Sequence, residues 1–287
     1  MAHFEETAIG FKAIFQKTFN ETTTKADTLC MRVTSTDLSE KYVWLGNFPM
    51  MKEWIGDRDI KKFKDYGYAL ENVPFEATVT VPNNHIEYDK VGLYRPAIEQ
   101  MAYNAKRFGG TLVAKILLDA EDATKGKCYD GKPFFSNAHV LGSDTYSNVG
   151  TGALTSDNLI AAEALLSSIK GDSGQSLGIV STHLVCGPKS LAKAINAVQK
   201  ENLTAGETNP TYKRYELLVL PEITDASWYL MDLGKPVKPF VLQVAKDGIF
   251  ESSNDHKFLK DHALFGCKSF MNAGFALWQL AYKSSGV

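Results

Sequence analysis

Three side chains in one stretch of the chain are of the types that nucleophilic catalysis needs. Cys128 is followed by Asp130 and then by His139. A cysteine hydrolase requires a thiol and a histidine brought together in space, with a third group that orients the histidine. Closeness along the chain does not establish that geometry, and residues 125–133 also have the composition of a turn in which Asp130 and Gly131 supply the backbone conformation. We favour the structural turn over a hydrolase site that uses Cys128.

Acidic side chains at the two ends of a long helical pattern are a second candidate for chemistry. They are Glu87, Asp89, Asp119, Glu121 and Asp122. Carboxylates can bind a metal ion or exchange protons, but the first pair precedes the helix, where negative charge simply favours the helix dipole. His183 lies inside a strand pattern and is interpreted as a core or interface residue. The six histidines form no ligand cluster.

Recognised catalytic and nucleotide-binding motifs are missing from the sequence. It contains no Walker A sequence, no GxGxxG after a strand, no HExxH and no GxSxG. The cysteines lie far apart and form no CxxC pair, so neither a zinc site nor a disulfide framework is expected. They are Cys30, Cys128, Cys186 and Cys267. We therefore predict buried or free thiols in a reducing compartment, no enzymatic activity, no cofactor and no metal.

The composition excludes further classes of function. The chain has 287 residues, of which 44% are hydrophobic and 22% charged, with a net charge of −2. A general nucleic-acid binder needs a basic excess, which this chain lacks. No apolar run reaches the roughly 18 residues that span a bilayer, and Glu5 and Glu6 stand where a signal peptide would be basic. The length suits two lobes or one large domain.

The element that must position the rest is a long helix expected over Pro96–Leu118. At about 1.5 Å per residue it would measure about 34 Å, well above the usual three or four turns. Its apolar face is marked by side chains at spacings of three and four: Tyr94, Ile98, Met101, Ala105, Phe108, Leu112 and Ile116. Gly109 and Gly110 interrupt it, which predicts either a bend or close backbone packing.

Before this helix the sequence predicts a β-hairpin. Tyr66, Tyr68 and Leu70 alternate, a turn follows near residues 72–74, and a strand runs from Phe75. An isolated hairpin is marginally stable in water, so we expect a second body, such as another subunit, to support it.

The first 58 residues carry unusual numbers of aromatic side chains. Residues 1–40 form an arm with a helical stripe of phenylalanines that packs on the body or on another chain. Residues 42–58 contain two tryptophans, and aromatic side chains on loops often anchor protein–protein contacts.

Beyond residue 122 the pattern is that of an α/β lobe. A helix is expected from Thr155 or Ser156 to Gly171, and another from Ser190. Strands are expected at residues 177–185, 217–220, 228–231 and 237–244, and the apolar tail at 265–282 is expected to be core.

Eight stretches, in order, resemble the major head subunits of phage Mu and Mu-like prophages. They are Tyr42–Pro49, Trp54–Arg58, Asn72–Val79, Tyr129–Phe135, Thr182–Val185, Trp228–Asp232, Val237–Phe240 and Asn272–Ala281. The set covers most of the chain from Tyr42 to Tyr282.

The resemblance implies an α+β fold, the tailed-phage capsid fold of the Hong Kong 97 type. It implies an N-terminal arm at 1–40, an extended hairpin loop at 41–85, a peripheral lobe with a spine helix at 86–122, an axial lobe at 123–245, and a C-terminal part at 246–287 that returns to both lobes.

The function implied by the resemblance is assembly. Copies of the chain would form hexamers and pentamers of an icosahedral head around non-specifically bound DNA, with a portal, a scaffold and a head-maturation protease as further partners and no membrane. The protein would be assembled in the bacterial cytoplasm and remain in the virion. Eight aromatic residues are the predicted inter-subunit contacts: Phe4, Phe11, Phe15, Trp44, Trp54, Tyr66, Tyr68 and Phe75. The alternatives are an encapsulin-type nanocompartment shell and the Cys128 hydrolase.

Overall fold

The structure, a computed structural model, describes residues 2–45, 67–171, 174–202, 206–255 and 260–287. Its α-helices are α1 (Ala2–Glu21), α2 (Asn83–Glu87), α3 (Arg95–Asp119), α4 (Ser156–Ser167) and α5 (Leu191–Val198). Its 3-10 helices are η1 (Ala26–Leu29), η2 (Val91–Tyr94), η3 (Pro188–Ser190) and η4 (Trp278–Leu280). Its strands are β1 (Cys30–Thr34), β2 (Ser39–Lys41), β3 (Ala69–Glu71), β4 (Val73–Pro82), β5 (His139–Leu141), β6 (Asp144–Tyr146), β7 (Val149–Gly150), β8 (His183–Cys186), β9 (Glu216–Val219), β10 (Trp228–Met231), β11 (Phe240–Ser253), β12 (His262–Phe275) and β13 (Ala281–Ser284).

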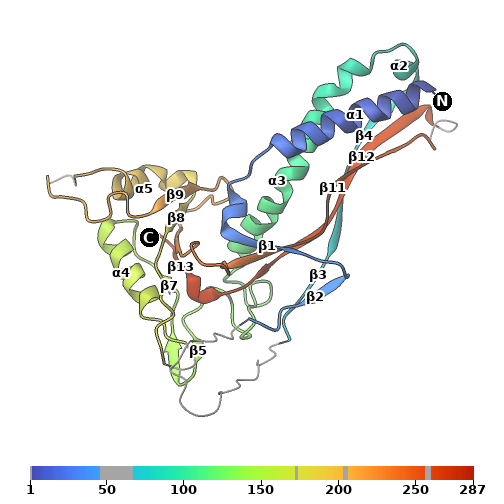
Figure 1. Cartoon of the computed structure of the whole chain (residues 1–287). Helices are drawn as coiled ribbons and strands as arrows, with labels where there is room; N and C mark the ends of the chain where they lie inside the picture. Colours follow the sequence, from blue (N-terminus) through green and yellow to red (C-terminus); the bar gives the residue numbers. More distant parts are fainter. Residues whose placement is uncertain (1, 46–66, 172–173, 203–205, 256–259) are drawn as a thin grey trace.

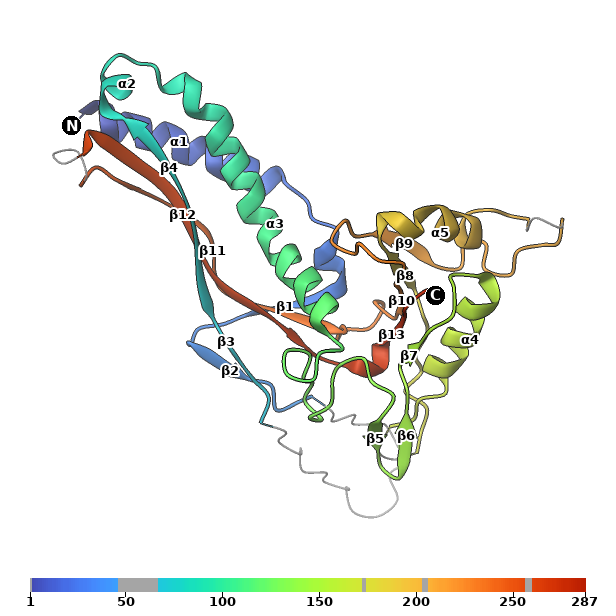
Figure 2. The same cartoon turned by 180° about the vertical axis from the view of Figure 1, so that it is seen from behind.

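Two lobes are visible in Figure 1. In the long-helix lobe, α1 and α3 lie along one face of a four-stranded sheet of order β1-β11-β12-β4. β1 runs parallel to β11, and the other neighbours are antiparallel. Alternate residues of β12 are buried, which is the pattern of a sheet covered by helices on one face only. Figure 2 shows the same layers from behind.

The predicted long helix is confirmed as α3, which begins at Arg95 and is about 37 Å long. Pro96 occupies its first turn, where a missing N–H costs nothing. The buried face differs in part from the predicted stripe. In the second half of α3 the buried residues are Gly109, Gly110, Val113, Ala114 and Leu117.

Gly109 and Gly110 account for that difference because they allow close packing on both sides of the helix. A Cβ atom at Gly109 would lie 2.7 Å from Leu242 Cδ2 of β11, and one at Gly110 would lie 2.9 Å from Ala26 Cβ of η1. Of the two predicted explanations for the glycine pair, the structure supports close packing.

The predicted hairpin is wrong in its pairing. β4 is a strand, as its alternation indicated, but it pairs along its whole length with β12, from Val73↔Met271 to Pro82↔His262. β3 pairs instead with β2, from Ser39↔Glu71 to Lys41↔Ala69. The support expected from another subunit is supplied for β4 by its own chain. The partner strand lies nearly two hundred residues away, so no local pattern identifies it.

The five-stranded lobe has the sheet order β7-β13-β10-β8-β9. β8 and β9 are parallel, and the connection between them contains α5, as the predicted strand–helix unit requires. All four residues of β10 are buried. Thr155 caps α4 by accepting a hydrogen bond from the Asn158 N–H at 3.3 Å.

Two predicted strands have different bounds. The strand expected at 177–185 is reduced to β8, because the carbonyls of Leu177 and Gly178 accept hydrogen bonds from the Lys235 ammonium instead of a neighbouring strand. The strand expected at 237–244 starts at Phe240 and continues to Ser253. Since β11 belongs to the four-stranded sheet, the predicted axial-lobe boundary at 245 falls inside a strand of the long-helix lobe.

Candidate functional site

The segment around Cys128 is a turn held by its own backbone. The Cys128 N–H donates to the Lys132 carbonyl at 2.7 Å, and the Gly131 N–H donates to the Cys128 carbonyl at 3.0 Å. Gly131 has φ +82°, a left-handed conformation that favours glycine. Asp130 Oδ1 accepts from the Lys132 N–H at 3.1 Å. The turn interpretation of these residues is confirmed.

Cys128 is not placed as a nucleophile. Its thiol is 3% exposed and lies 3.7 Å from the Ala276 carbonyl oxygen, to which it donates. Burial raises the pKa of the Cys128 thiol well above its ordinary value, and the Asp130 charge raises it further. A buried thiol that holds its proton is an inert packing group.

His139 contacts other partners. Its Nδ1 lies 2.6 Å from Asp130 Oδ2, and its Nε2 lies 3.2 Å from the Phe134 carbonyl oxygen. Its ring stacks on Trp278, with centroids 3.9 Å apart and planes inclined by 6°. Both nitrogens face acceptors and neither faces Cys128, so the three residues form no hydrolase site. They tie the 125–135 turn, β5 and η4 together.

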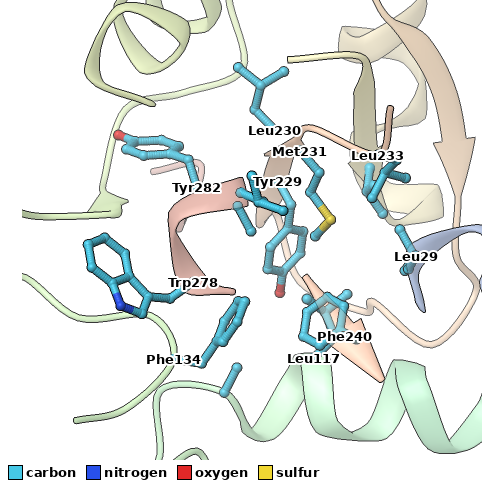
Figure 3. Close-up of a cluster of buried hydrophobic side chains, with 14 of the residues drawn as sticks. Leu29, Leu117, Phe134, Tyr229, Leu230, Met231, Leu233, Phe240, Trp278 and Tyr282 are labelled. Atoms are coloured by element: carbon cyan, nitrogen blue, oxygen red, sulfur yellow. The ribbon is translucent and has the colours of Figure 1, made fainter. Parts of the chain in front are cut away.

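These contacts belong to a hub where the lobes join, shown in Figure 3. Phe134 stands 5.0 Å from Phe240 at the start of β11 and 5.2 Å from Phe275 at the end of β12, measured between ring centroids. Leu117 of α3 and Tyr229 of β10 enter the same cluster. The cluster therefore fixes the end of the long helix to both sheets.

A buried amide joins the polar groups of this hub. The Asn148 Nδ2, with two N–H groups to donate, lies within hydrogen-bond distance of three carbonyl oxygens, those of Phe134 at 2.8 Å, Ala281 at 3.2 Å and Trp278 at 3.3 Å. This one side chain therefore links the 125–135 turn to the η4–β13 segment through backbone carbonyls that are buried beside an apolar cluster.

The acidic residues beside α3 do not form a metal site. Asp89 lies beyond the end of α2, in a left-handed turn with φ +54°, rather than in the first turn of α3, so the predicted dipole role is wrong for it. At the other end of α3, Glu121 forms an ion pair with Lys283 at 2.7 Å. Asp122 caps a turn by accepting hydrogen bonds from the N–H groups of Thr124 and Lys125, and these hydrogen bonds lower the pKa of its carboxyl group. No group of three metal-ligating side chains occurs in the described part of the chain.

His183 is half-buried in β8, with its Nε2 3.3 Å from Glu216 Oε2 of β9. Burial lowers the pKa of this imidazole despite the opposing Glu216 charge.

The predicted inter-subunit residues that the structure describes all pack within their own chain. Phe11 lies 4.9 Å and Phe4 5.7 Å from the Phe265 ring of β12, and Phe15 lies 5.5 Å from the Phe250 ring of β11. Phe11 and Phe15 are only 3% and 1% exposed, so the phenylalanine stripe packs against the body of its own subunit.

The remaining members of that set lie around the sheet and the β2–β3 pair. Trp44 is in contact with Tyr42 at 5.9 Å between centroids, Phe75 with Phe108 of α3 at 4.5 Å, and the Tyr68 hydroxyl accepts from the Phe275 N–H at 2.8 Å. Trp54 and Tyr66 lie outside the described residues. Contact of any of the eight with a neighbouring subunit stays a prediction.

The sequence patterns did not predict three exposed apolar residues of the long-helix lobe. Ile9, Tyr88 and Leu93 are 70%, 75% and 72% exposed. The only signal in the sequence was their place outside any apolar stripe, because Ile9 is out of phase with the phenylalanines of α1.

Three comparisons relate the chain to known proteins. The sequence profile of the family described as Mu-like prophage major head subunit gpT matches residues 4–154, 146–223 and 222–286. The major capsid protein of Escherichia phage Mu is 27% identical over 280 residues, which are 95% of this chain and 70% of that protein. The Mu-like prophage FluMu major head subunit of Haemophilus influenzae is 26% identical over 97% of this chain and 71% of its own length.

Among solved structures, a chain of the bacteriophage JBD30 procapsid superposes on this one with a TM-score of 0.63. The two are 25% identical, and the match covers 99% of this chain and 75% of the other.

Proposed function

This chain belongs to the Mu-like prophage major head subunit family and is a structural, shell-forming protein, and we propose that its copies close into an icosahedral head around phage DNA. Its fold is the tailed-phage capsid fold of the Hong Kong 97 type, as the sequence resemblance predicted. The observation that supports the function most is that family and fold both match over nearly the whole chain. The encapsulin and hydrolase alternatives are not favoured.

The lobes of this fold suggest how a subunit is divided. We assign the long-helix lobe to the peripheral position in a capsomer and the five-stranded lobe to the axial position. The hub around Phe134 then holds the two at a fixed angle, which a shell of defined curvature requires.

The β2–β3 pair is the base of the extended loop in this proposal. The Tyr42 hydroxyl donates to Gln243 Oε1 at 2.8 Å, and Gln243 Nε2 donates to the Leu70 carbonyl at 3.1 Å. Gln243 is fully buried in β11, so the base is anchored to the sheet. The loop itself, residues 42–68, is proposed to contact a neighbouring subunit.

Partners and location follow from the same function. The head is proposed to form in the bacterial cytoplasm on a portal and a scaffold, to be processed by a head protease, and to persist in the virion. A net charge of −2 suits a wall that contacts packaged DNA weakly and without sequence preference. Among the described residues no helix has the length and apolar character to cross a membrane. The chain is proposed to have no catalytic activity of its own.

Size is the first test of the function. Purified chain, measured by sedimentation velocity and electron microscopy, should form capsomers or megadalton shells. A chain that stays monomeric at every concentration, alone and with the other head proteins of its host, would contradict the proposal. Particles from the native host should contain DNA; a protein cargo without DNA would support the nanocompartment instead.

The loop has a separate test. Residues 46–66 are replaced by a short Gly-Ser linker, which can join Leu45 to Gly67 because the Tyr42 N–H already donates to the Tyr68 carbonyl at 2.9 Å. This change keeps β4, whose deletion would remove a sheet strand and unfold the lobe. The shortened subunit should melt within a few degrees of the full chain yet give no closed shells. Closed shells of ordinary size would refute the role of the loop and leave the shell function standing.

A further inference from the structure

Besides the hub, the two lobes face each other across a cavity of about 250 Å³, which we call the interlobe cavity. One wall belongs to the long-helix lobe and is formed by residues 23–26, Tyr103, Arg107, Gly110 and Thr111. The other wall is formed by residues 219–222, at the end of β9 and in the turn that follows it. Figures 1 and 2 both show the α1–η1 connection beside the β9 end of the five-stranded lobe. The lobes are therefore tightly packed at the hub and separated by open space at this second place.

Side chains of opposite charge line the two walls of the interlobe cavity. Glu222 stands on the five-stranded lobe, whereas Lys25 and Arg107 stand on the long-helix lobe. Among the described residues, neither cation has a carboxylate oxygen within 4.0 Å. Arg107 donates instead to the Tyr103 hydroxyl of its own helix at 3.3 Å. Charges that could pair between the lobes are thus left apart in this conformation.

Two polar atoms from opposite walls are buried and have no hydrogen-bond partner in the part of the chain that the structure describes. They are Glu222 Oε2 and Thr24 Oγ1. Buried polar atoms of native proteins are nearly always hydrogen-bonded, because an unsatisfied one loses its water without compensation. A closer approach of the two walls would supply the carboxylate with donors, since Lys25 and Arg107 line the same space.

Glu222 is held firmly to its own lobe. The Leu220 N–H donates to the Cys186 carbonyl of β8 at 3.0 Å, and the Ile223 N–H donates to the Leu220 carbonyl at 3.2 Å. Ile223 is fully buried, so the turn that carries Glu222 moves with the five-stranded sheet. The distance from Glu222 to the cations of the other wall therefore depends on how closely the two lobes approach.

We propose that Glu222 forms an interlobe ion pair with Lys25 and Arg107 when the five-stranded lobe closes on α3, and that this structure is the open conformation. The hub fixes the lobes at Leu117, and Arg107 lies about 15 Å from Leu117 along the helix. One point of attachment permits rotation, whereas two points define an angle, so the ion pair sets the angle between the lobes. The proposal concerns a single subunit and does not depend on the proposed shell function.

The distance between the lobes tests the closure directly. Ile9→Cys on α1 and Ile195→Cys on α5, at positions 70% and 36% exposed, each receive a spin label, and pulsed electron resonance measures the separation in the unassembled full chain. The native cysteines are all buried, so the introduced thiols react first. α1 and α5 lie on the same side of the hub in both views, so closure shortens this separation.

Glu222→Gln keeps the shape of the side chain and removes its charge. It should lengthen the separation between the labels by about 3 Å, the thickness of one layer of water. Glu207→Gln is the matched control, because Glu207 is exposed on the same lobe and does not line the cavity; it should leave the separation unchanged. Equal separations in the Glu222→Gln chain and the unaltered chain would overturn the proposal.

A double-mutant cycle tests which charges pair. Chemical denaturation of the unassembled subunit is measured for Glu222→Gln, for Arg107→Gln and Lys25→Gln, and for each combination. Residues in one ion pair should show a coupling of about twofold or more in the unfolding equilibrium constant. Glu207→Gln with Arg107→Gln should show none. If Glu222→Gln acts independently of both cation variants, the proposed pairing is refuted.

Failure of the ion pair and failure of the shell function are distinguishable, because both measurements use the unassembled subunit. Shells formed by a chain whose lobes do not respond to Glu222→Gln would overturn the ion pair alone. A chain that closes as proposed and never assembles would overturn the shell function alone.

Discussion

Replacing Gly110 by alanine separates close packing from flexibility as the reason for the glycine pair. In an unhindered helix interior the change stabilises by about 1 kcal/mol. Here the new Cβ would stand 2.9 Å from Ala26 Cβ, whereas carbon atoms pack at about 3.5–4.0 Å. Ala26 has no rotamer through which to move, and η1 is held by fully buried Leu29 and by the Lys238 ammonium on the Thr28 carbonyl at 2.9 Å.

The helix must therefore shift by up to about 1 Å, and overpacking of this kind costs about 1–3 kcal/mol. The net free energy of unfolding should fall by about 0–2 kcal/mol. Thermal melting of the unassembled subunit measures the change, at about 2–4 °C per kcal/mol for a chain of comparable size.

Gly10→Ala is the matched control, because Gly10 is also inside a helix but a Cβ there meets nothing within 4 Å. It should raise the melting temperature, by the full helix-propensity gain of about 1 kcal/mol. If Gly110→Ala stabilises as much as Gly10→Ala, the packing argument is refuted and the glycine pair is a flexible point after all.

Three further predictions concern side chains inside the subunit. Burial raises the pKa values of three thiols to about 12, 11 and 11: Cys30, Cys186 and Cys267. Above the ordinary thiol pKa of 9.0 the unfolded chain loses these protons while the folded chain keeps them, so the free energy of unfolding should fall as pH rises from about 9 to 12. A thiol reagent at pH 8 should modify the native chain far more slowly than the unfolded chain. Fast modification of the native chain would contradict the burial. His139→Ala leaves Asp130 without its imidazole partner and opens a cavity against Trp278, so the free energy of unfolding measured by chemical denaturation should fall by about 3 kcal/mol. Cys128→Ala should leave shell formation intact. Lys235→Met removes the donor to the carbonyl of Gly178 and should speed proteolysis between α4 and β8, with Lys132→Met as the control that does not.

Local patterns identified the helices well because their periodicity is written in consecutive residues. α3 was found within a residue of each end, and β10 with the same bounds. The patterns predicted the wrong buried residues in the second half of α3. A search for large apolar side chains treats Gly109 and Gly110 as interruptions of the helix, although the backbone of α3 makes its closest contacts at these two residues. Small residues carry packing information only when the partner surface is known.

Strand pairing was out of reach for a different reason. The alternation of β4 shows which of its side chains share a face of the sheet, but it does not show which strand pairs with it. Because a strand-like segment precedes β4 in the sequence, the simplest interpretation was a hairpin. The sheet instead pairs β4 with β12, whose own hydrophobic pattern was assigned only to core. The candidate chemistry failed similarly: Cys128, Asp130 and His139 are near each other in space, but the imidazole faces Asp130 and Phe134, and nothing in the sequence fixes the direction of a ring.

The long helix connects the hub to the far tip of the long-helix lobe. Its C-terminal end is fixed at Leu117 in the hub, and its N-terminal end adjoins the tip that bears Leu93. A shift of about 1 Å at Gly110, about 10 Å from Leu117, would rotate the helix by about 5°. Over the roughly 33 Å from Leu117 to Arg95, that rotation displaces the tip by about 3 Å, which is enough to separate side chains that touch within about 4 Å. A folded Gly110→Ala subunit should therefore close into shells less readily than the unaltered subunit, as electron microscopy of assembled samples would show, and undiminished shell formation would mean that the lobe absorbs the shift before it reaches the tip.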